Sequence, residues 1–164
     1  MKRLSEVRVD LAALESERPR IRVAALITID DRVVLVRHRK DDAAYHLLPG
    51  GGVEHRETLA QALAREVAEE TGLGIVVGRP LLISDTIAPD GSRHTVNIIF
   101  DAAVTHGSLA DPAGDPRIEA VELVDSESLS TLDLRPPIAG ALVRALASRP
   151  TFAAEYLGAP YSSK

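Results

Sequence analysis

Short runs of aliphatic and β-branched residues recur along the chain, and residues that favour turns separate them. Two of these runs, residues 22–29 and 32–37, flank Asp30-Asp31, which predicts a β-hairpin. Two longer runs flank the tetrapeptide that ends at Gly91, whose Pro and Gly are typical of a β-turn. We therefore expect strands at residues 22–29, 32–37, 45–48, 75–86, 95–104 and 118–124.

Two other segments have the period of an α-helix. Residues 57–71 are rich in Ala, Leu and Glu and contain neither Gly nor Pro, and the following Gly72 is a residue type that commonly ends a helix. Pro136-Pro137 opens the second segment, whose apolar residues share one helical face. Strands interleaved with two helices predict an α/β or α+β sandwich. The apolar face of the second helix would comprise Ile138, Ala141, Leu142, Ala145 and Leu146.

The chain has 164 residues, 45% of them hydrophobic, which suits one globular domain with a buried core. We divide it into an N-terminal extension (1–19), a central domain (20–148) and a C-terminal tail (149–164). The tail holds three of the five aromatic residues, and we expect it to dock on another surface. These three are Phe152, Tyr156 and Tyr161.

Net charge and cysteine content narrow the function classes. There are 19 Lys and Arg against 24 Asp and Glu, so the formal net charge is −5, which argues against a nucleic-acid polymer or an anionic membrane as the main partner. The chain has no cysteine, which excludes disulfides, zinc-thiolate sites and a cysteine nucleophile, and it favours the cytoplasm. Its longest aliphatic runs are far shorter than the ~18 residues of a membrane helix.

Three glutamates crowd into the end of the first predicted helix. At 100° per residue, Glu66, Glu69 and Glu70 span about 100° of arc, and they border the apolar stripe rather than opposing it. Such packing costs several tenths of a kcal/mol per group through repulsion and the helix dipole. Arg65 can pair with Glu69 but cannot neutralise three acids, so the pattern favours a hard divalent cation as counter-charge.

The spacing around these glutamates matches a known motif. The sequence fits G-x5-E-x7-R-E-U-x-E-E-x-G-U, where U is aliphatic, at every fixed position. This pattern resembles the Nudix box of the Nudix hydrolases, also called the MutT family. The matching residues are Gly51, Glu57, Arg65, Glu66, Val67, Glu69, Glu70, Gly72 and Leu73.

The resemblance covers roughly residues 20–148 and implies a Nudix-type α/β/α sandwich with a mixed β-sheet. It implies hydrolysis of a nucleoside diphosphate linked to another moiety, with Mg²⁺ or Mn²⁺ as cofactor. By position, the three glutamates of the helix end would hold the metal with help from the Gly51 carbonyl, and Glu57 and Arg65 would orient the loop. His46 stands where many relatives carry a tryptophan.

Residues outside the box supply further candidates for the site. A carboxylate must take a proton from the attacking water. We favour Glu66, with Glu119 or Glu122 from a distant segment as the alternative. Arg37 and Arg39 would form a phosphate-facing basic edge or, equally, a solvated strand end. Tyr45 would stack on a base or simply pack at the rim of the core.

For the substrate we expect ADP-ribose or a similar nucleotide sugar. Relatives that cleave ADP-ribose tend to carry a proline about sixteen residues beyond the box, and Pro89 lies sixteen after Leu73, although an ordinary turn also explains it. The alternative function is that of a nucleoside triphosphate pyrophosphohydrolase. A domain that senses nucleotides without cleaving them ranks below it. Because extensions flank the domain, we also expect a homodimer.

Overall fold

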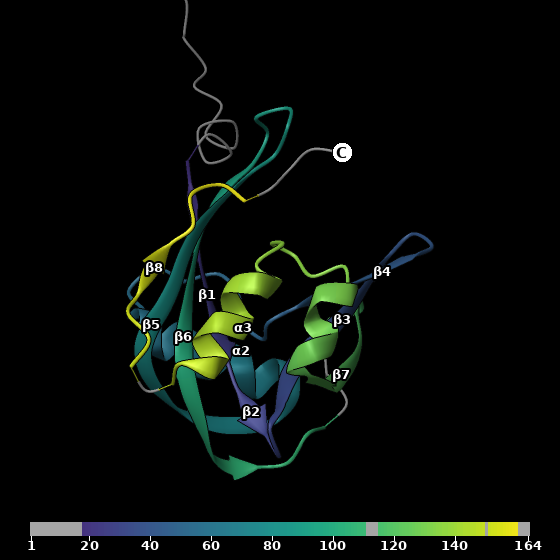
Figure 1. Cartoon of the computed structure of the whole chain (residues 1–164). Helices are drawn as coiled ribbons and strands as arrows, with labels where there is room; N and C mark the ends of the chain where they lie inside the picture. The colour runs from purple at the N-terminus through teal and green to yellow at the C-terminus, as the bar shows by residue number, and fades with distance from the viewer. Residues whose placement is uncertain (1–17, 111–114, 150, 161–164) are drawn as a thin grey trace, which may run out of the picture.

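The computed structural model describes residues 18–110, 115–149 and 151–160, and its strands form two four-stranded sheets that splay apart (Figure 1). The first sheet has the order β1-β6-β5-β8. β1 runs parallel to β6, β6 antiparallel to β5, and β5 parallel to β8, so the sheet is mixed. Its strands are β1 (Arg20–Leu26), β5 (Leu73–Ile87), β6 (His94–Gly107) and β8 (Glu155–Tyr156).

The second sheet is antiparallel and has β3 at its centre. β3 pairs with β2 and β4 in one path and with β7 beside it. Asp30 and Asp31 have φ values of 48° and 61°, which suit the two-residue turn of a hairpin, so the predicted turn is confirmed. Only Thr28 and Ile29 of the predicted strand 22–29 pair with β3, however, because the residues up to Leu26 form β1 and pair with β6 in the first sheet. The strands are β2 (Thr28–Ile29), β3 (Arg32–Lys40), β4 (Ala43–Leu47) and β7 (Ile118–Asp125).

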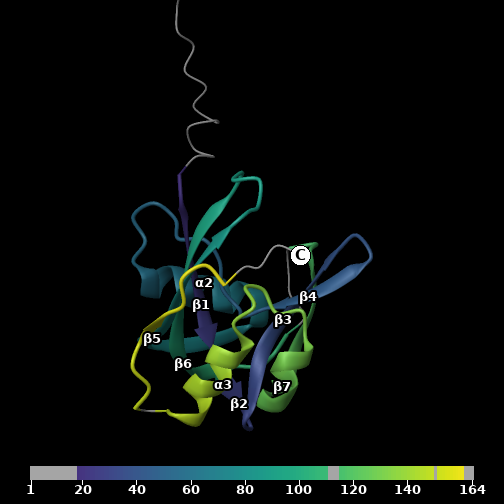
Figure 2. The same cartoon turned by 45° about the horizontal axis from the view of Figure 1, so that its top comes forward.

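Two helices cover opposite sides of these sheets, as the predicted α/β/α sandwich requires (Figure 2). α2 (Leu59–Thr71) buries Leu63 and Val67 in one core cluster. α3 (Ala139–Ala147) and the 3₁₀ helix η1 (Ser126–Thr131) contribute to a second cluster on the other side. β1 contributes to both clusters, because alternate residues of a strand point to opposite faces.

The ends of α2 have local causes. Thr58 is the N-cap, and its hydroxyl accepts the Gln61 N–H while the Gln61 side chain accepts the Thr58 N–H. The helix therefore begins at Leu59, two residues later than the sequence pattern predicted. Gly72 ends it at a φ of 75°, in the left-handed region, as expected.

The tail docks on the domain, as predicted. Phe152 and Leu157 pack against the α3-side core, and Tyr156, although 66% exposed, donates a hydrogen bond to Asp85 (2.7 Å). Tyr161 and residues 1–17 of the predicted extension lie outside the described residues. In the part of the chain that is described, no helix has the length and apolar character needed to cross a membrane.

Candidate active site

A glycine-rich turn of residues 48–52, here called the glycine turn, follows β4 and runs along the edge of β1. Backbone N–H groups of Ala25 and Val23 donate to the carbonyls of Pro49 (2.9 Å) and Gly51 (3.0 Å). Gly50 has a φ of 144°, and an added Cβ there would overlap the carbonyl of Val23. The turn can lie this close to β1 because its glycines have no side chains.

The C-terminal half of α2 lies against this turn. The Gly50 N–H donates to Glu70 Oε2 (2.8 Å). Gly51 faces Glu66 so closely that an added Cβ would overlap the carboxyl group. The tertiary structure thus brings together the predicted site residues Gly51, Glu66 and Glu70.

Arg65 joins the remaining predicted residues of the box. Its Nε and Nη2 donate to the two carboxyl oxygens of Glu57 (2.8 and 2.9 Å), a bidentate pair. Nη1 donates to Glu66 (2.9 Å) and, at 3.5 Å, to Glu69. We call Glu57, Glu66, Glu69 and Glu70 the acidic cluster.

Burial and pairing shift the pKa values in this cluster in opposite directions. Burial raises the pKa of Glu70 to about 7, and the Gly50 N–H only partly offsets this effect. The hydrogen bonds from Arg65 and from the Glu54 N–H lower the pKa of Glu57 to about 2. Glu57 is therefore a fixed negative charge near neutral pH, whereas Glu70 is poised to respond to a nearby cation.

The donor set fits a hard divalent cation, because it consists of carboxylates beside a backbone carbonyl. Gly51 lies so close to Glu66 that no side chain could fit between them, and its carbonyl accepts a hydrogen bond from the Val23 N–H (3.0 Å). Within residues 18–110, 115–149 and 151–160, however, no three acidic, His or Cys side chains converge as metal ligands. Arg65 instead holds Glu66 and Glu69, so a cation would compete with Arg65 for these carboxylates.

Arg22, which the motif does not include, is one site residue that sequence reasoning missed. Its Nη2 donates to the carbonyls of Leu48 (2.9 Å) and Gly50 (2.8 Å). Burial lowers the pKa of Arg22, while the charges of Glu70 and Glu66 act against that shift. The sequence offered little signal, because Arg22 is one of three arginines, with Arg18 and Arg20, that precede the apolar run beginning at Val23.

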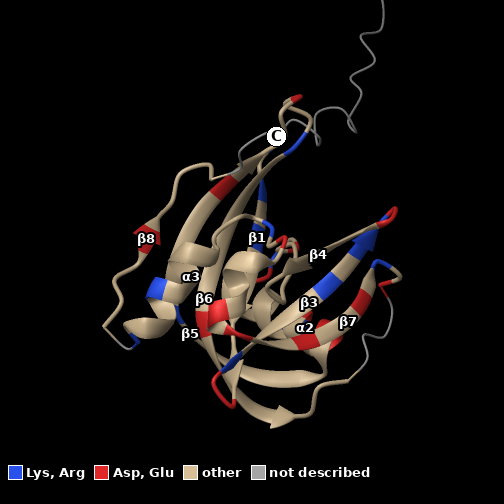
Figure 3. Ribbon diagram, turned by 45° about the vertical axis from the view of Figure 1, so that its right-hand side comes forward, with Lys and Arg blue, Asp and Glu red and all other residues tan. Residues whose placement is uncertain are grey.

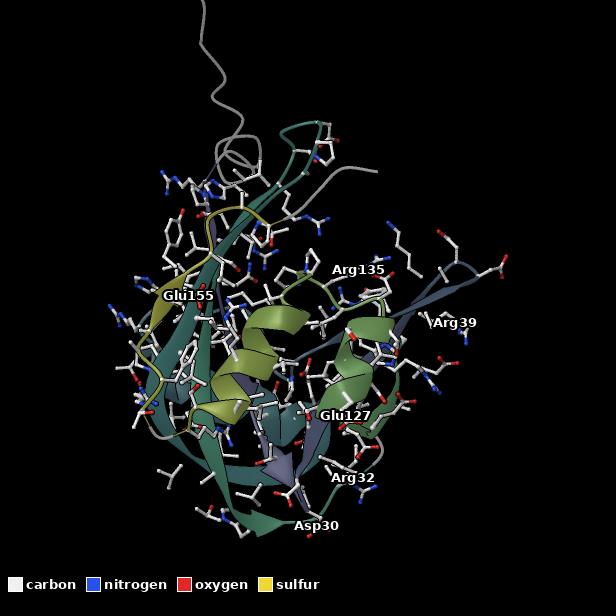
Figure 4. All side chains as sticks on the ribbon, viewed as in Figure 1. Asp30, Arg32, Arg39, Glu127, Arg135 and Glu155 are labelled. Carbon is white, nitrogen blue, oxygen red and sulfur yellow. The ribbon has the colours of Figure 1, made fainter. Side chains whose placement is uncertain are left out.

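A second group of residues near the acidic cluster comes from β3, β4 and the segments that precede β7 and α3. His38 is 5% exposed, its Nε2 has no hydrogen-bond partner, and burial lowers its pKa. Its ring stacks on Tyr45 at a centroid distance of 5.4 Å. Arg135, labelled in Figure 4, lies in the loop before α3. Its Cζ is 4.3 Å from the centroid of the same tyrosine ring. Asp115 contributes to raising the pKa of Glu70, which places its charge within electrostatic reach of the acidic cluster.

The other predicted residues form a separate group, the charge ladder, made of Arg37, Arg39, His46, Glu119 and Glu122. Arg37 Nε and Arg39 Nη2 bind Glu119 at 3.0 and 2.8 Å. Arg37 also pairs with Glu122, which lies 3.0 Å from His46 Nε2. Figure 3 shows basic residues of β3 beside acidic residues of β7. Arg37, Arg39 and Glu119 are therefore joined to one another rather than to the acidic cluster.

Comparison with known proteins gives a consistent result. The chain is 34% identical over 115 residues to an ADP-ribose pyrophosphatase of Methanocaldococcus jannaschii, covering 70% of this chain and 66% of that relative. It is 26% identical over 142 residues to the phosphatase NudJ of Escherichia coli, covering 86% and 92%. The solution structure of the E. coli ORF135 protein superposes with a TM-score of 0.68 at 26% identity, covering 81% and 94%.

The family model of the NUDIX domain matches residues 18–146, which include the glycine turn, α2 and both sheets except β8. The match extends over most of the chain and contains the whole acidic cluster. This chain therefore belongs to the Nudix family, whose members are pyrophosphohydrolases acting on small nucleotide derivatives.

Proposed function

We propose that this protein is a metal-dependent hydrolase that cleaves the diphosphate linkage of a nucleoside diphosphate derivative such as ADP-ribose or a nucleotide sugar. The observation that carries the proposal is that Glu66 and Glu70 lie directly against the glycine turn. Arg65 donates hydrogen bonds to both Glu57 and Glu66 beside it. A surplus of carboxylates beside bare backbone is the arrangement that a divalent cation and a diphosphate need.

Mg²⁺ or Mn²⁺ would neutralise charge on the diphosphate and lower the pKa of a bound water. Glu66, Glu69 and Glu70 would hold the ion, and the Gly51 carbonyl would assist. The water oxygen would add to one phosphorus, and the bond from that phosphorus to the bridging oxygen would break. The products would be a nucleoside monophosphate and a phosphorylated sugar.

Glu66 is the proton acceptor in this proposal. Glu119 is a weaker candidate, because hydrogen bonds from Arg39 lower its pKa and so make it a poorer base. Glu122 is likewise engaged, by Arg37 and His46. Glu66 also accepts a hydrogen bond from Arg65, but it lies against Gly51 of the glycine turn, whereas both alternatives belong to the charge ladder; this difference in position favours Glu66.

The choice of ADP-ribose rests on the similarity to the archaeal ADP-ribose pyrophosphatase. Pro89 does not add weight to it, because Pro89 sits inside a turn in which the Gly91 N–H donates to the Ala88 carbonyl (2.8 Å). The base would lie near Tyr45, whose ring already contacts His38 and Arg135. We therefore expect stacking on the Arg135–Tyr45 pair rather than on the tyrosine alone.

A substrate panel tests the proposal. EDTA-treated protein is supplied with Mg²⁺ or Mn²⁺ and offered ADP-ribose, nucleotide sugars and nucleoside triphosphates, and products are identified by mass spectrometry. We expect nucleoside monophosphate and sugar phosphate from ADP-ribose, and no turnover without metal. Full activity in EDTA would contradict the metal dependence. Rapid turnover of nucleoside triphosphates, with no turnover of ADP-ribose or nucleotide sugars, would show that triphosphates are the substrate class instead.

We also propose that the protein is a homodimer. The support is a set of exposed apolar side chains on the first sheet: Ile21 (46% exposed), Ile87 (44%) and Tyr156 (66%). Exposed apolar patches often mark contact surfaces between proteins. Sedimentation velocity at micromolar concentration should give a dimer, and a monomer would contradict the proposal.

A further inference from the structure

Five consecutive carbonyl groups, those of residues 48–52, belong to the glycine turn, and each accepts a hydrogen bond. Backbone N–H groups of β1 donate to Pro49 and Gly51 (2.9 and 3.0 Å), and Arg65 donates to Gly52 (3.3 Å). Partly buried carbonyls without donors are costly, so the shape of the turn depends on all five bonds.

The remaining two carbonyls depend on one side chain. Nη2 of Arg22 donates both to Leu48 (2.9 Å) and to Gly50 (2.8 Å). Arg22 lies on β1, the strand that also binds the turn through its backbone, so its guanidinium reaches the carbonyls that the strand's N–H groups do not serve. The charges of Glu70 and Glu66 act on the same guanidinium.

We propose that Arg22 is a positioning residue that holds the glycine turn in the shape on which the acidic cluster's affinity for a divalent cation depends. The inference rests on the proposed function, because the cation is the one that hydrolysis would use. Gly50 links Arg22 to Glu70, because its carbonyl accepts a hydrogen bond from Arg22 and its N–H donates one to Glu70. A displaced Gly50 peptide would misplace the donor that orients Glu70, and would move Gly51 against Glu66.

Loss of Arg22 has two opposing effects on cation binding. Removing a positive charge favours the cation, whereas removing two hydrogen bonds lets the turn rearrange. Burial leaves the charge of Arg22 only weakly screened by solvent, so its loss favours the cation; however, the two buried carbonyls must then find new donors, and the Gly50 N–H that orients Glu70 moves with them. The loss of shape therefore dominates, and affinity falls.

The chain offers a matched control in Arg149. Arg149 Nη2 donates to the carbonyl of Leu26 (2.9 Å), at the other end of β1, and pairs with Asp101 (2.6 Å). It is thus an arginine that holds backbone of the same strand without contacting the acidic cluster. Arg149→Met should lower stability and leave cation affinity unchanged.

The experiment titrates Mn²⁺ into EDTA-treated wild-type protein and the Arg22→Met, Arg22→Lys and Arg149→Met variants. Calorimetry and the electron paramagnetic resonance signal of free Mn²⁺ report the Kd, and hydrolysis of ADP-ribose reports the half-activating Mn²⁺ concentration. We expect the Kd to rise about 10-fold in Arg22→Met. A rise of roughly 3-fold is expected in Arg22→Lys, because an ammonium does not reproduce the planar fork.

The possible outcomes distinguish failure of this inference about Arg22 from failure of the proposed function. A Kd in Arg22→Met equal to or below that of wild type would overturn the inference while leaving the proposed function intact. If circular dichroism shows that Arg22→Met does not fold, Arg22→Lys decides, and a wild-type Kd there would overturn the inference. Arg22-dependent Mn²⁺ binding without hydrolysis of any diphosphate would overturn only the proposed function, and a wild-type protein that binds no Mn²⁺ would overturn both.

Discussion

The acidic cluster and the charge ladder contain the same kinds of residue but differ in charge balance. Four glutamates of the acidic cluster face two arginines, Arg22 and Arg65, whereas two glutamates of the ladder face two arginines and a histidine. The acidic cluster therefore keeps negative charge that the protein does not neutralise. The ladder is already balanced, so it has little need of a cation.

The two regions also differ in what their side chains touch. Glu70 and Arg65 bind backbone groups of the glycine turn, which can itself approach a metal or a phosphate. In the ladder, the ion pairs join side chains of β3 and β7 and so tie two strands together. A cluster of charged residues is thus a candidate site when its charge is uncompensated and it lies against bare backbone.

The largest expected effect separates the two regions directly. Glu66→Gln and Glu70→Gln are nearly isosteric, yet each removes a carboxylate from the acidic cluster, so kcat should fall by about 10²–10⁴-fold. The matched change in the ladder, Glu119→Gln, should leave kcat near the wild-type value. Steady-state kinetics on ADP-ribose, with circular dichroism as the folding check, measure both. Equal losses in the two regions would erase the distinction.

A smaller loss of kcat is expected from adding one methyl group to the glycine turn. Gly51→Ala would push the Glu66 carboxyl group aside, and misplacement by about 1 Å can cost roughly 100-fold in rate. Gly140→Ala is the control, because Gly140 lies in α3, where its Cβ would meet Arg144 at an ordinary 3.9 Å. The control should be neutral or slightly stabilising. A fully active Gly51→Ala enzyme would show that close approach to Glu66 is unimportant.

The pairing of Glu57 with Arg65 predicts a pH effect on stability. The folded-state pKa of Glu57 is about 2 against an ordinary value of 4.5, so its contribution is present above pH 4.5 and is lost as pH falls toward 2. The difference in Tm between wild type and Glu57→Gln should therefore be largest above pH 5 and shrink toward pH 2.5. Thermal unfolding followed at several pH values gives the answer, and a constant difference would refute the pairing.

The smallest effect is expected at the exposed end of the ladder. Arg39 is 50% exposed in its side chain and pairs with Glu119, so Arg39→Gln should change Tm by no more than ~2 °C and leave KM near its wild-type value. A several-fold rise in KM would instead show that Arg39 contacts substrate phosphates. That result would move Arg39 from the ladder into the active site.

The local sequence was enough to predict the positions of most strands, the helix α2 and the motif. The box spans residues 51–73, and within a helix the spacing of Glu66, Glu69 and Glu70 fixes their common direction. Most predicted strand boundaries fell within about three residues of the observed ones, because β-branched runs and turn residues are local signals. The exception is the predicted strand 22–29, which the structure divides into β1 and β2 of different sheets. The start of α2 was misplaced because the Thr58 cap was not considered, and η1 and β8 are too short to leave a periodic pattern.

Only the tertiary structure decided the partner of each charged residue. Arg37 meets Glu119 across 82 positions of sequence, and Arg22 meets Gly50 across 28. The first pairing depends on the register of β3 against β7, which shifts between Arg37 and His38. A shift of one residue in a strand turns its side chains to the opposite face, so composition alone could not tell a phosphate-binding arginine from one that closes a salt bridge.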